Sequence, residues 1–355
     1  MNGAGSEIRR IAGPGRGPHG MPAAIALTPI LSARFRTRDL ERMRAAAPGS
    51  RIVMVSTEGL ADGPLDDVEV LLRGFVSAEA FDRLLARAPR LAWVHSASAG
   101  VERVLTPAGR ARGLVITNAR GVFSAPIAEY VLMMILAISR RLPQLLELQR
   151  EQTWQPLEGT ELRDVTVGIV GLGSIGHAVA DLARAFGCRI IATRRHPEGD
   201  GAALEAPGAL EAPGALDAVW GPEMLPTLLG EADFVVLALP LTPETEDLID
   251  ATALAHFKPG AWLINVARGR LVDERALLRA LREGPLGGAV LDAFREEPLA
   301  PTSPFYDLAN VIVTPHTSWS SARVLDRSVE LFCENLGRYA GGEPLLNVVD
   351  PAAGY

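Results

Sequence analysis

Residues 165–187 read VTVGIVGLGSIGHAVADLARAFG, an apolar run that passes through a glycine-rich turn into a helical pattern. Gly171, Gly173 and Gly176 have the G-x-G-x-x-G spacing. Between a strand and a helix, the first glycine permits a tight turn, the second lets the backbone approach a pyrophosphate, and the third lets the helix pack on the strand. The N-terminus of the helix can then hold the diphosphate charge. The stretch therefore predicts a site for a dinucleotide.

Strand-like apolar runs alternate with helical patterns after this turn. They are nearly continuous in apolar residues, as expected for parallel strands that helices cover on both faces. Together with residues 165–170 they make six strands, the others lying at residues 189–193, 234–239, 261–266, 288–291 and 311–314. Six strands with helical crossovers predict an α/β fold with a Rossmann-type, doubly wound parallel sheet in a dinucleotide-binding domain over residues 123–322.

Two segments of this domain depart from the alternation. Residues 124–150 form a long helical pattern, in which Ser124 is placed to cap the helix and Pro143 should break it. Residues 199–220 contain a tandem repeat, EAPGAL at 205–210 and again at 211–216. We interpret residues 199–220 as a surface insertion without a catalytic role.

The N-terminal part predicts a second, smaller unit after a disordered tail at residues 1–22, which are rich in glycine, proline and arginine. Strand-like and helical patterns follow at residues 37–47, 52–55, 68–72, 77–87, 91–94 and 114–117. A final amphipathic helix begins near Ser321, and its apolar face is formed by Leu325, Val329, Phe332 and Leu336. It has no strand to pair with in the larger sheet. We therefore expect a discontinuous, flavodoxin-like α/β substrate domain made of residues 23–122 and 323–355.

Composition limits the class of protein. The 355 residues are enough for two domains, and 48% of them are apolar. The net charge of −7 argues against nucleic acid or an anionic membrane as the main partner. Cys188 and Cys333 lie far apart and outside any metal-ligand spacing, so we expect a reducing compartment, no disulfide framework and no metal. Residues 131–138, the most apolar run, are too short to cross a bilayer, and no signal peptide is visible, so a cytoplasmic protein is expected.

The second strand of the larger sheet bears on cofactor choice. In NAD binders an acidic residue normally ends this strand and binds the ribose hydroxyls. Here the strand ends in Thr193-Arg194-Arg195 instead. A guanidinium can hold a 2′-phosphate in a bidentate manner, so the sequence favours NADP(H) over NAD(H). The alternative is that both arginines are solvated surface charges and that a looser site accepts either cofactor.

Three segments place polar groups just beyond strand ends, where a doubly wound sheet builds its site. Arg268 follows the strand that ends at residue 266. Asp292 and Glu297 follow the strand at 288–291, and His316 follows the last strand after Pro315. Each residue alone also has a structural reading, as a surface charge, a helix cap or a buried core histidine. Their occurrence together at one sheet edge favours an active site.

In the segments that carry these residues, the chain resembles the D-isomer-specific 2-hydroxyacid dehydrogenases. Within that family it resembles the glyoxylate/hydroxypyruvate reductases. The resemblance covers roughly residues 90–320. Its blocks are GLGSIGHAVADLARAFG (171–187), LPLTPETEDLID (239–250), LINVARGRLVDERALLRAL (263–281), GGAVLDAFREEPL (287–299) and NVIVTPHTSW (310–319). The resemblance implies NAD(P)H as the cofactor, a small 2-oxo or 2-hydroxy acid as the substrate and a homodimer.

The resemblance also implies roles for matched residues. Arg268 would bind the substrate carboxylate, His316 would donate or accept the proton, Glu297 would partner His316, and Asp292 would contact the nicotinamide amide. The loop at residues 96–100 would meet the substrate carboxylate through backbone N–H groups, with Ser98, Ala99 and Gly100 as its binding residues. Further residues expected around the cofactor, besides the three glycines, are Ser174, Ile175, Thr193, Arg194, Arg195, Leu239, Pro240, Thr245, Val266, Ala267, Asp292 and His316. Glu102 and Arg103 depart from the usual residues after the substrate loop, which leaves the identity of the acid open.

The chemistry of a 2-oxo acid reductase fits these residue types. The cofactor supplies a hydride, a histidine can exchange a proton near neutral pH, and a neighbouring carboxylate favours the imidazolium. The fork of an arginine fixes a carboxylate and with it the angle of attack. Two rival functions stay open: a nicotinamide-binding regulator or corepressor on the same scaffold, and a phosphite- or formate-type dehydrogenase. Formate enzymes of this architecture lack a glutamate at the position of Glu297, which counts against them.

Overall fold

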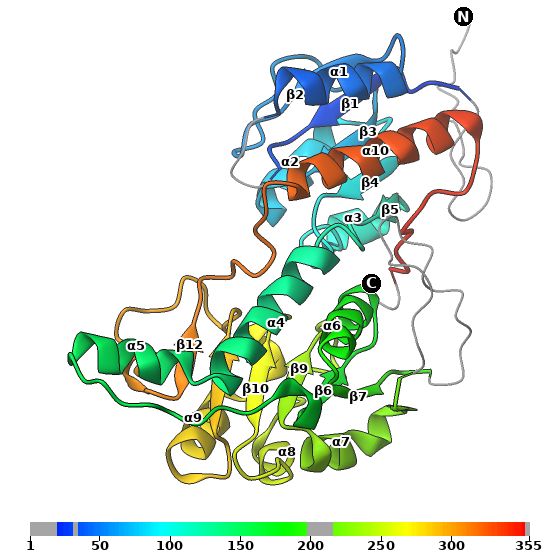
Figure 1. Cartoon of the computed structure of the whole chain (residues 1–355). Helices are drawn as coiled ribbons and strands as arrows, with labels where there is room; N and C mark the ends of the chain where they lie inside the picture. Colours follow the sequence, from blue (N-terminus) through cyan, green and yellow to red (C-terminus); the bar gives the residue numbers. More distant parts are fainter. Residues whose placement is uncertain (1–19, 31–34, 197–215, 352–355) are drawn as a thin grey trace, which may run out of the picture. The chain divides into compact units, whose positions relative to one another are not determined.

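The computed structural model describes residues 20–30, 35–196 and 216–351 (Figure 1). Most of the predicted tail at residues 1–22 and almost all of the tandem repeat at 205–216 therefore lie outside the described residues. The chain folds into two compact units. The first unit comprises Met1–Val122 and Ala322–Tyr355, and the second comprises Phe123–Ser321.

The second unit is built on a seven-stranded sheet in the order β12-β11-β10-β9-β6-β7-β8, in which every pair is parallel. The strands are β6 (Thr166–Val170), β7 (Arg189–Thr193), β8 (Ala218–Trp220), β9 (Phe234–Leu237), β10 (Trp262–Asn265), β11 (Gly288–Leu291) and β12 (Val311–Val313). From β6 the chain first builds outward through β7 and β8, and then returns to the other side of β6 with β9. This reversal is the switch point of a doubly wound sheet, beside which ligands bind at the carboxyl ends of the strands. The predicted Rossmann-type sheet is thus confirmed.

The sequence did not predict β8. Its three residues fall at the end of the segment that we interpreted as an insertion, and they pair with β7 from Ile191 to Thr193. A run of three apolar residues is too short to be distinguished from loop by pattern alone. That part of the insertion hypothesis was wrong, because Ala218–Trp220 belongs to the sheet.

The helices of the second unit lie in the crossovers between its strands and ahead of β6 (Figure 1). They are α4 (Ser124–Ser139), α5 (Leu142–Arg150), α6 (Ser174–Ala185), α7 (Leu225–Glu231), α8 (Ala251–Ala255) and α9 (Glu274–Glu283). The predicted break before Pro143 is confirmed, since Arg141 has φ 57° between α4 and α5. The prediction that Ser124 caps α4 was wrong: Phe123 occupies the cap position and Ser124 is the first helical residue.

The first unit contains a five-stranded parallel sheet in the order β2-β1-β3-β4-β5, the order of flavodoxin-like folds. Its strands are β1 (Ala24–Leu27), β2 (Arg51–Met54), β3 (Val68–Arg73), β4 (Trp93–Ser96) and β5 (Val115–Thr117), and its helices are α1 (Thr37–Ala46), α2 (Ala78–Arg87), α3 (Pro107–Ala111) and α10 (Val324–Gly341). β1 was not predicted as a separate strand. All four of its residues are buried at the centre of the sheet.

The C-terminal helix α10 packs in the first unit. It packs beside α1, and its predicted apolar face is buried, with Val329, Phe332 and Leu336 each 0% exposed. Phe332 and Tyr339 lie against the buried indole of Trp93 on β4, at ring-centroid distances of 5.6 and 5.3 Å. The helix begins at Val324, three residues after the expected start. Among the described residues, no helix is long and apolar enough to cross a membrane.

Candidate active site

The glycine turn after β6 has the geometry of a phosphate-binding turn. Gly171 has φ +100°, and a Cβ there would lie 2.8 Å from the carbonyl oxygen of Ala238 at the end of β9. A Cβ on Gly176 would lie 2.4 Å from the carbonyl oxygen of Gly171, so α6 can approach the turn only without a side chain. A Cβ on Gly173 would meet no described atom within 4 Å. The turn thus leaves open space beside Gly173, where α6 begins with Ser174 and presents its unpaired N–H groups.

The end of β7 lies one strand away from this turn. Thr193 is buried at 4% exposure, and Arg194 is half-buried with its backbone N–H bonded to the carbonyl oxygen of Trp220 at 2.9 Å. The exposed Arg195 approaches Glu244 at 3.9 Å, in the loop that follows β9. That loop holds the predicted Leu239, Pro240 and Thr245, and it is closed by the Thr245 hydroxyl, which donates to the carbonyl oxygen of Pro240 at 2.8 Å. These residues fit a dinucleotide along the carboxyl edge of the sheet.

The loop after β10 presents Arg268. The side-chain amide of Asn265, 1% exposed, donates to the carbonyl oxygen of Arg268 at 3.0 Å and accepts the N–H of Ala267 at 3.1 Å. The Arg268 guanidinium donates to the carbonyl oxygen of Ala267 at 2.9 Å. The next residue must be glycine, because a Cβ on Gly269 would lie 1.9 Å from the carbonyl carbon of Phe294. Val266 and Ala267 are buried, while Arg268 is half-buried. Asn265 therefore fixes the backbone from which Arg268 projects.

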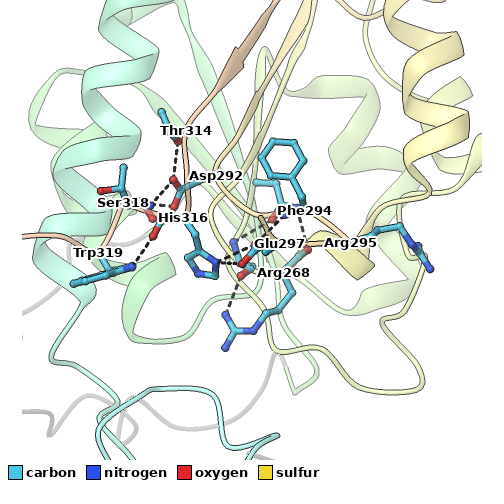
Figure 2. Close-up of polar contacts among 12 residues, drawn as sticks. Arg268, Asp292, Phe294, Arg295, Glu297, Thr314, His316, Ser318 and Trp319 are labelled. Atoms are coloured by element: carbon cyan, nitrogen blue, oxygen red, sulfur yellow. Dashed lines mark hydrogen bonds and ion pairs between the residues drawn. The ribbon is translucent and has the colours of Figure 1, made fainter. Parts of the chain in front are cut away.

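His316 and Glu297 form the closest polar pair of the site. Nδ1 of His316 lies 2.9 and 3.0 Å from the two carboxylate oxygens of Glu297, and Figure 2 shows Arg268 beside this pair. Burial raises the pKa of the Glu297 carboxyl. The hydrogen bonds from His316 and from the backbone N–H of Phe294, with the charges of His316 and Arg268, outweigh that effect and bring the pKa below its ordinary value. Because Glu297 holds the Nδ1 edge of the ring, Nε2 is the nitrogen that can serve a substrate.

The backbone of His316 is strained. Its φ is +50°, in the left-handed region that costs a non-glycine residue about 1–3 kcal/mol. Two contacts hold this conformation: the N–H of His316 donates to the carbonyl oxygen of Thr314 at 3.0 Å, and the indole of Trp319 donates to the carbonyl oxygen of His316 at 2.7 Å. Pro315 lies between Thr314 and His316. Strain of this kind persists only where the surroundings over-determine it, and it clusters at functional sites.

Asp292 lies behind this loop, 1% exposed, at the end of β11. Its carboxylate accepts the Thr314 hydroxyl at 2.6 Å, the N–H of Thr317 at 2.8 Å and the N–H of Ser318 at 2.9 Å (Figure 2). The Asp292 side chain therefore holds the histidine loop in place. Its implied contact with a nicotinamide amide stays a prediction.

The structure brings Arg268, Glu297 and His316 together within the second unit. The predicted substrate loop follows β4 in the first unit, where Ser98 is exposed and Ala99 and Gly100 are half-buried. The carbonyl oxygen of Ala99 accepts the side-chain amide of Asn118 at 2.8 Å, which shapes the loop. Sequence reasoning missed the roles of Asn265, Thr314 and Trp319. Only Asn265, a polar residue that closes an apolar strand, carried a signal that could have identified it.

The family of the chain follows from comparison with known proteins. Residues 132–318 match the family described as "D-isomer specific 2-hydroxyacid dehydrogenase, NAD binding domain". A glyoxylate reductase of Korarchaeum cryptofilum is 32% identical over 323 residues, which cover 88% of this chain and 90% of that protein. The chain belongs to the D-isomer specific 2-hydroxyacid dehydrogenase family, as the sequence motifs indicated.

Three further relatives add detail. D-3-phosphoglycerate dehydrogenases of Mycobacterium bovis and Mycobacterium tuberculosis are 38% identical over 289 residues, or 80% of this chain. The match spans 51% of those proteins, so the chain corresponds to about half of their length. The crystal structure of a D-isomer specific 2-hydroxyacid dehydrogenase from Xanthobacter autotrophicus Py2, in complex with NADPH and MES, is 31% identical with a TM-score of 0.79. The match covers 94% of this chain and 100% of that one.

Substitution of Gly173 in the glycine turn should weaken cofactor binding but hardly change the stability of the protein. Gly173→Ala places a methyl group in the open space, so it should weaken binding of NADPH or NADH at least about tenfold, a loss of about 1.4 kcal/mol. The thermal unfolding midpoint without cofactor should fall by no more than about 4 °C. Gly176→Ala, the matched control, forces a clash inside the fold and should lower the stability by about 1–3 kcal/mol. Cofactor titration by fluorescence and thermal unfolding measure both. Binding by Gly173→Ala equal to that of the wild type would contradict this account.

Proposed function

We propose that the chain is an NAD(P)H-dependent reductase of small 2-oxo acids that forms D-2-hydroxy acids. The observation that carries the proposal is the grouping of Arg268, Glu297 and His316 on the sheet edge that also bears the glycine turn (Figure 2). The K. cryptofilum relative, named a glyoxylate reductase, supports glyoxylate as the first substrate to test, and we add hydroxypyruvate as the second. We assign the second unit to the dinucleotide and the first unit, with the loop at 96–100, to the substrate.

The three side chains divide the work of reduction. Arg268 binds the carboxylate of the 2-oxo acid and orients the adjacent carbonyl. His316, with Nδ1 bonded to Glu297, delivers a proton from Nε2 to the carbonyl oxygen. Glu297 stabilises the imidazolium before transfer and keeps the ring in one orientation. When bound along the glycine turn, NAD(P)H supplies the hydride.

NADP(H) is our proposed cofactor. Arg194 and Arg195 stand at the end of β7, in place of the acidic residue expected of an NAD binder. The structurally similar Xanthobacter dehydrogenase was crystallised with NADPH, which agrees with this choice.

We further propose a homodimer that works in a reducing cytoplasm. Among the described residues α5 buries none of its side chains, and Leu142, Leu145 and Leu146 are 46%, 39% and 42% exposed. Trp154, just beyond this helix, is 102% exposed. A second copy could cover these apolar side chains, and sedimentation velocity measures whether it does. Both cysteines carry free thiols, which agrees with a reducing compartment.

The activity is tested with a panel of 2-oxo acids, with NADPH and NADH in parallel. Hydroxypyruvate and phenylpyruvate should give mainly the D-product, and His316→Ala should lower kcat about 10²- to 10⁴-fold while cofactor binding survives. Nicotinamide absorbance and chiral chromatography are the measurements. A protein that binds cofactor but turns over none of the acids would instead be a regulator or corepressor. Turnover of phosphite or formate alone would identify the other rival, and an L-product would refute the proposal.

The pairing of Glu297 with His316 predicts a pH effect. The lowered pKa of Glu297 keeps its carboxylate charged at neutral pH, so it favours the protonated histidine that reduction requires. Glu297→Gln keeps the shape but removes the charge. The basic limb of the kcat profile for reduction should then move to lower pH, because the charge that favours the imidazolium is gone. An unchanged limb would mean that Glu297 does not support the proton donor.

Cofactor preference is tested by reversing charge at the end of β7. Arg194→Asp should lower kcat/KM with NADPH about 10- to 100-fold, since a charged hydrogen bond is worth about 1.5–3 kcal/mol, while activity with NADH should hold or rise. Arg195→Asp makes the same charge change one residue further, where the side chain is exposed, and comparison of the two variants shows which arginine makes the larger contact. A wild type that strongly prefers NADH would show that neither arginine binds a 2′-phosphate.

A further inference from the structure

Behind the histidine loop, Tyr130 on α4 joins the polar contacts of Asp292. The Tyr130 hydroxyl lies 2.7 Å from the Thr314 hydroxyl, which lies 2.6 Å from Oδ1 of Asp292. We propose that Tyr130 and Thr314 are positioning residues that act through Asp292 to hold His316 in its reactive place. This inference rests on the proposed reductase function and extends it to residues that touch neither substrate nor cofactor.

The direction of the hydrogen bonds follows from the donors available. Asp292 accepts the N–H groups of Thr317 and Ser318, so its carboxylate acts as an acceptor throughout. The Thr314 hydroxyl has one hydrogen, and it donates this hydrogen to Asp292. Tyr130 must therefore donate to Thr314, which gives a chain of donors from Tyr130 to Thr314 to Asp292.

Tyr130 is suited to a permanent donor role. Its side chain is 9% exposed, and burial raises its pKa to about 12, with the nearby negative charge of Asp292 acting in the same direction. The phenol thus keeps its proton across the working pH range, and the hydrogen bonds from Tyr130 through Thr314 to Asp292 keep their direction.

The hydrogen bonds that start at Tyr130 reach residues on both sides of the strained histidine. Thr314 precedes His316 by two residues, and Thr317 and Ser318 follow it directly, so one carboxylate binds the loop before and after the left-handed residue. Loosening the carboxylate lets the loop relax toward ordinary backbone angles and draws the His316 ring away from Glu297. The glycine turn lies at the end of a different strand, β6, so the turn that would hold the diphosphate is separate from these hydrogen bonds.

The test is a set of variants that differ by single functional groups. Thr314→Val removes the central hydroxyl at constant size and should lower kcat about 10- to 100-fold, since it takes one donor from Asp292 and removes the acceptor of the Tyr130 hydroxyl. Thr314→Ser keeps the hydroxyl and should stay within about threefold of the wild type. Tyr130→Phe removes the first donor only and should lower kcat about 3- to 10-fold. Tyr306→Phe, at an exposed tyrosine of the same unit, is the matched control and should change nothing.

Three readouts separate positioning from a general loss of structure. Every variant should still bind NADPH, because the glycine turn is unchanged. The double variant Tyr130→Phe/Thr314→Val should be no slower than Thr314→Val alone, because both residues act through one chain. The basic limb of the kcat profile should move to lower pH in Thr314→Val and Tyr130→Phe, and return to the wild-type position in Thr314→Ser.

An NMR measurement that needs no turnover tests the positioning role of Tyr130 and Thr314 independently of the reductase activity. The NMR signal of the His316 imidazole, assigned with His316→Ala, is followed against pH in each variant. Its midpoint should fall in Thr314→Val and Tyr130→Phe, and should match the wild type in Thr314→Ser and Tyr306→Phe. If the wild type reduces no 2-oxo acid, the proposed function fails while this titration still decides the positioning role. Wild-type midpoints in Thr314→Val and Tyr130→Phe, or additive losses in the double variant, overturn the inference.

Discussion

The buried carboxylate of Asp292 is the constraint on which the site depends. It closes β11, its backbone N–H bonds to the carbonyl oxygen of Asn265 on β10 at 3.0 Å, and its side chain binds the loop that follows β12. Three neighbouring strand ends are thereby tied to one residue. Arg268 projects from the first of these ends, Glu297 follows the second and His316 follows the third. A parallel sheet brings the three ends to one edge, and Asp292 holds the loop that carries His316.

Electrostatics around this edge combine fixed charge with partial access to solvent. Glu297 and His316 each keep 38% of their side chains exposed, so neither is charged in a dry interior. Arg268 and the histidine proton favour the carboxylate of Glu297, and that carboxylate in turn favours the protonated ring. The net charge of −7 for the chain does not oppose an anionic substrate, because the local cation lies closer than the acidic surface.

Sequence reasoning reached the features that depend on local pattern. The glycine spacing, the buried parallel strands and the polar residues that follow them can all be read from short stretches of chain. β1 and β8 were missed because each is a brief run whose strand character comes from its neighbours in the sheet. Ser124 was misread as a cap since the chain enters α4 one residue earlier than the side-chain type suggested. Tyr130 could not have been found, because it lies in an apolar helical run and its partner Thr314 is 184 residues away.

The return of α10 to the first sheet has a consequence for the order of folding. The second unit is one continuous stretch, Phe123–Ser321, and all its strands are available once that stretch has left the ribosome. The first unit holds β1 near the start of the chain, yet the face of its sheet around Trp93 is covered by Phe332 and Tyr339. Val348 also adds an antiparallel bridge to Thr117 on β5. The part of the chain that is made first is therefore finished last, and the area of its sheet that α10 covers stays exposed during synthesis of the whole second unit.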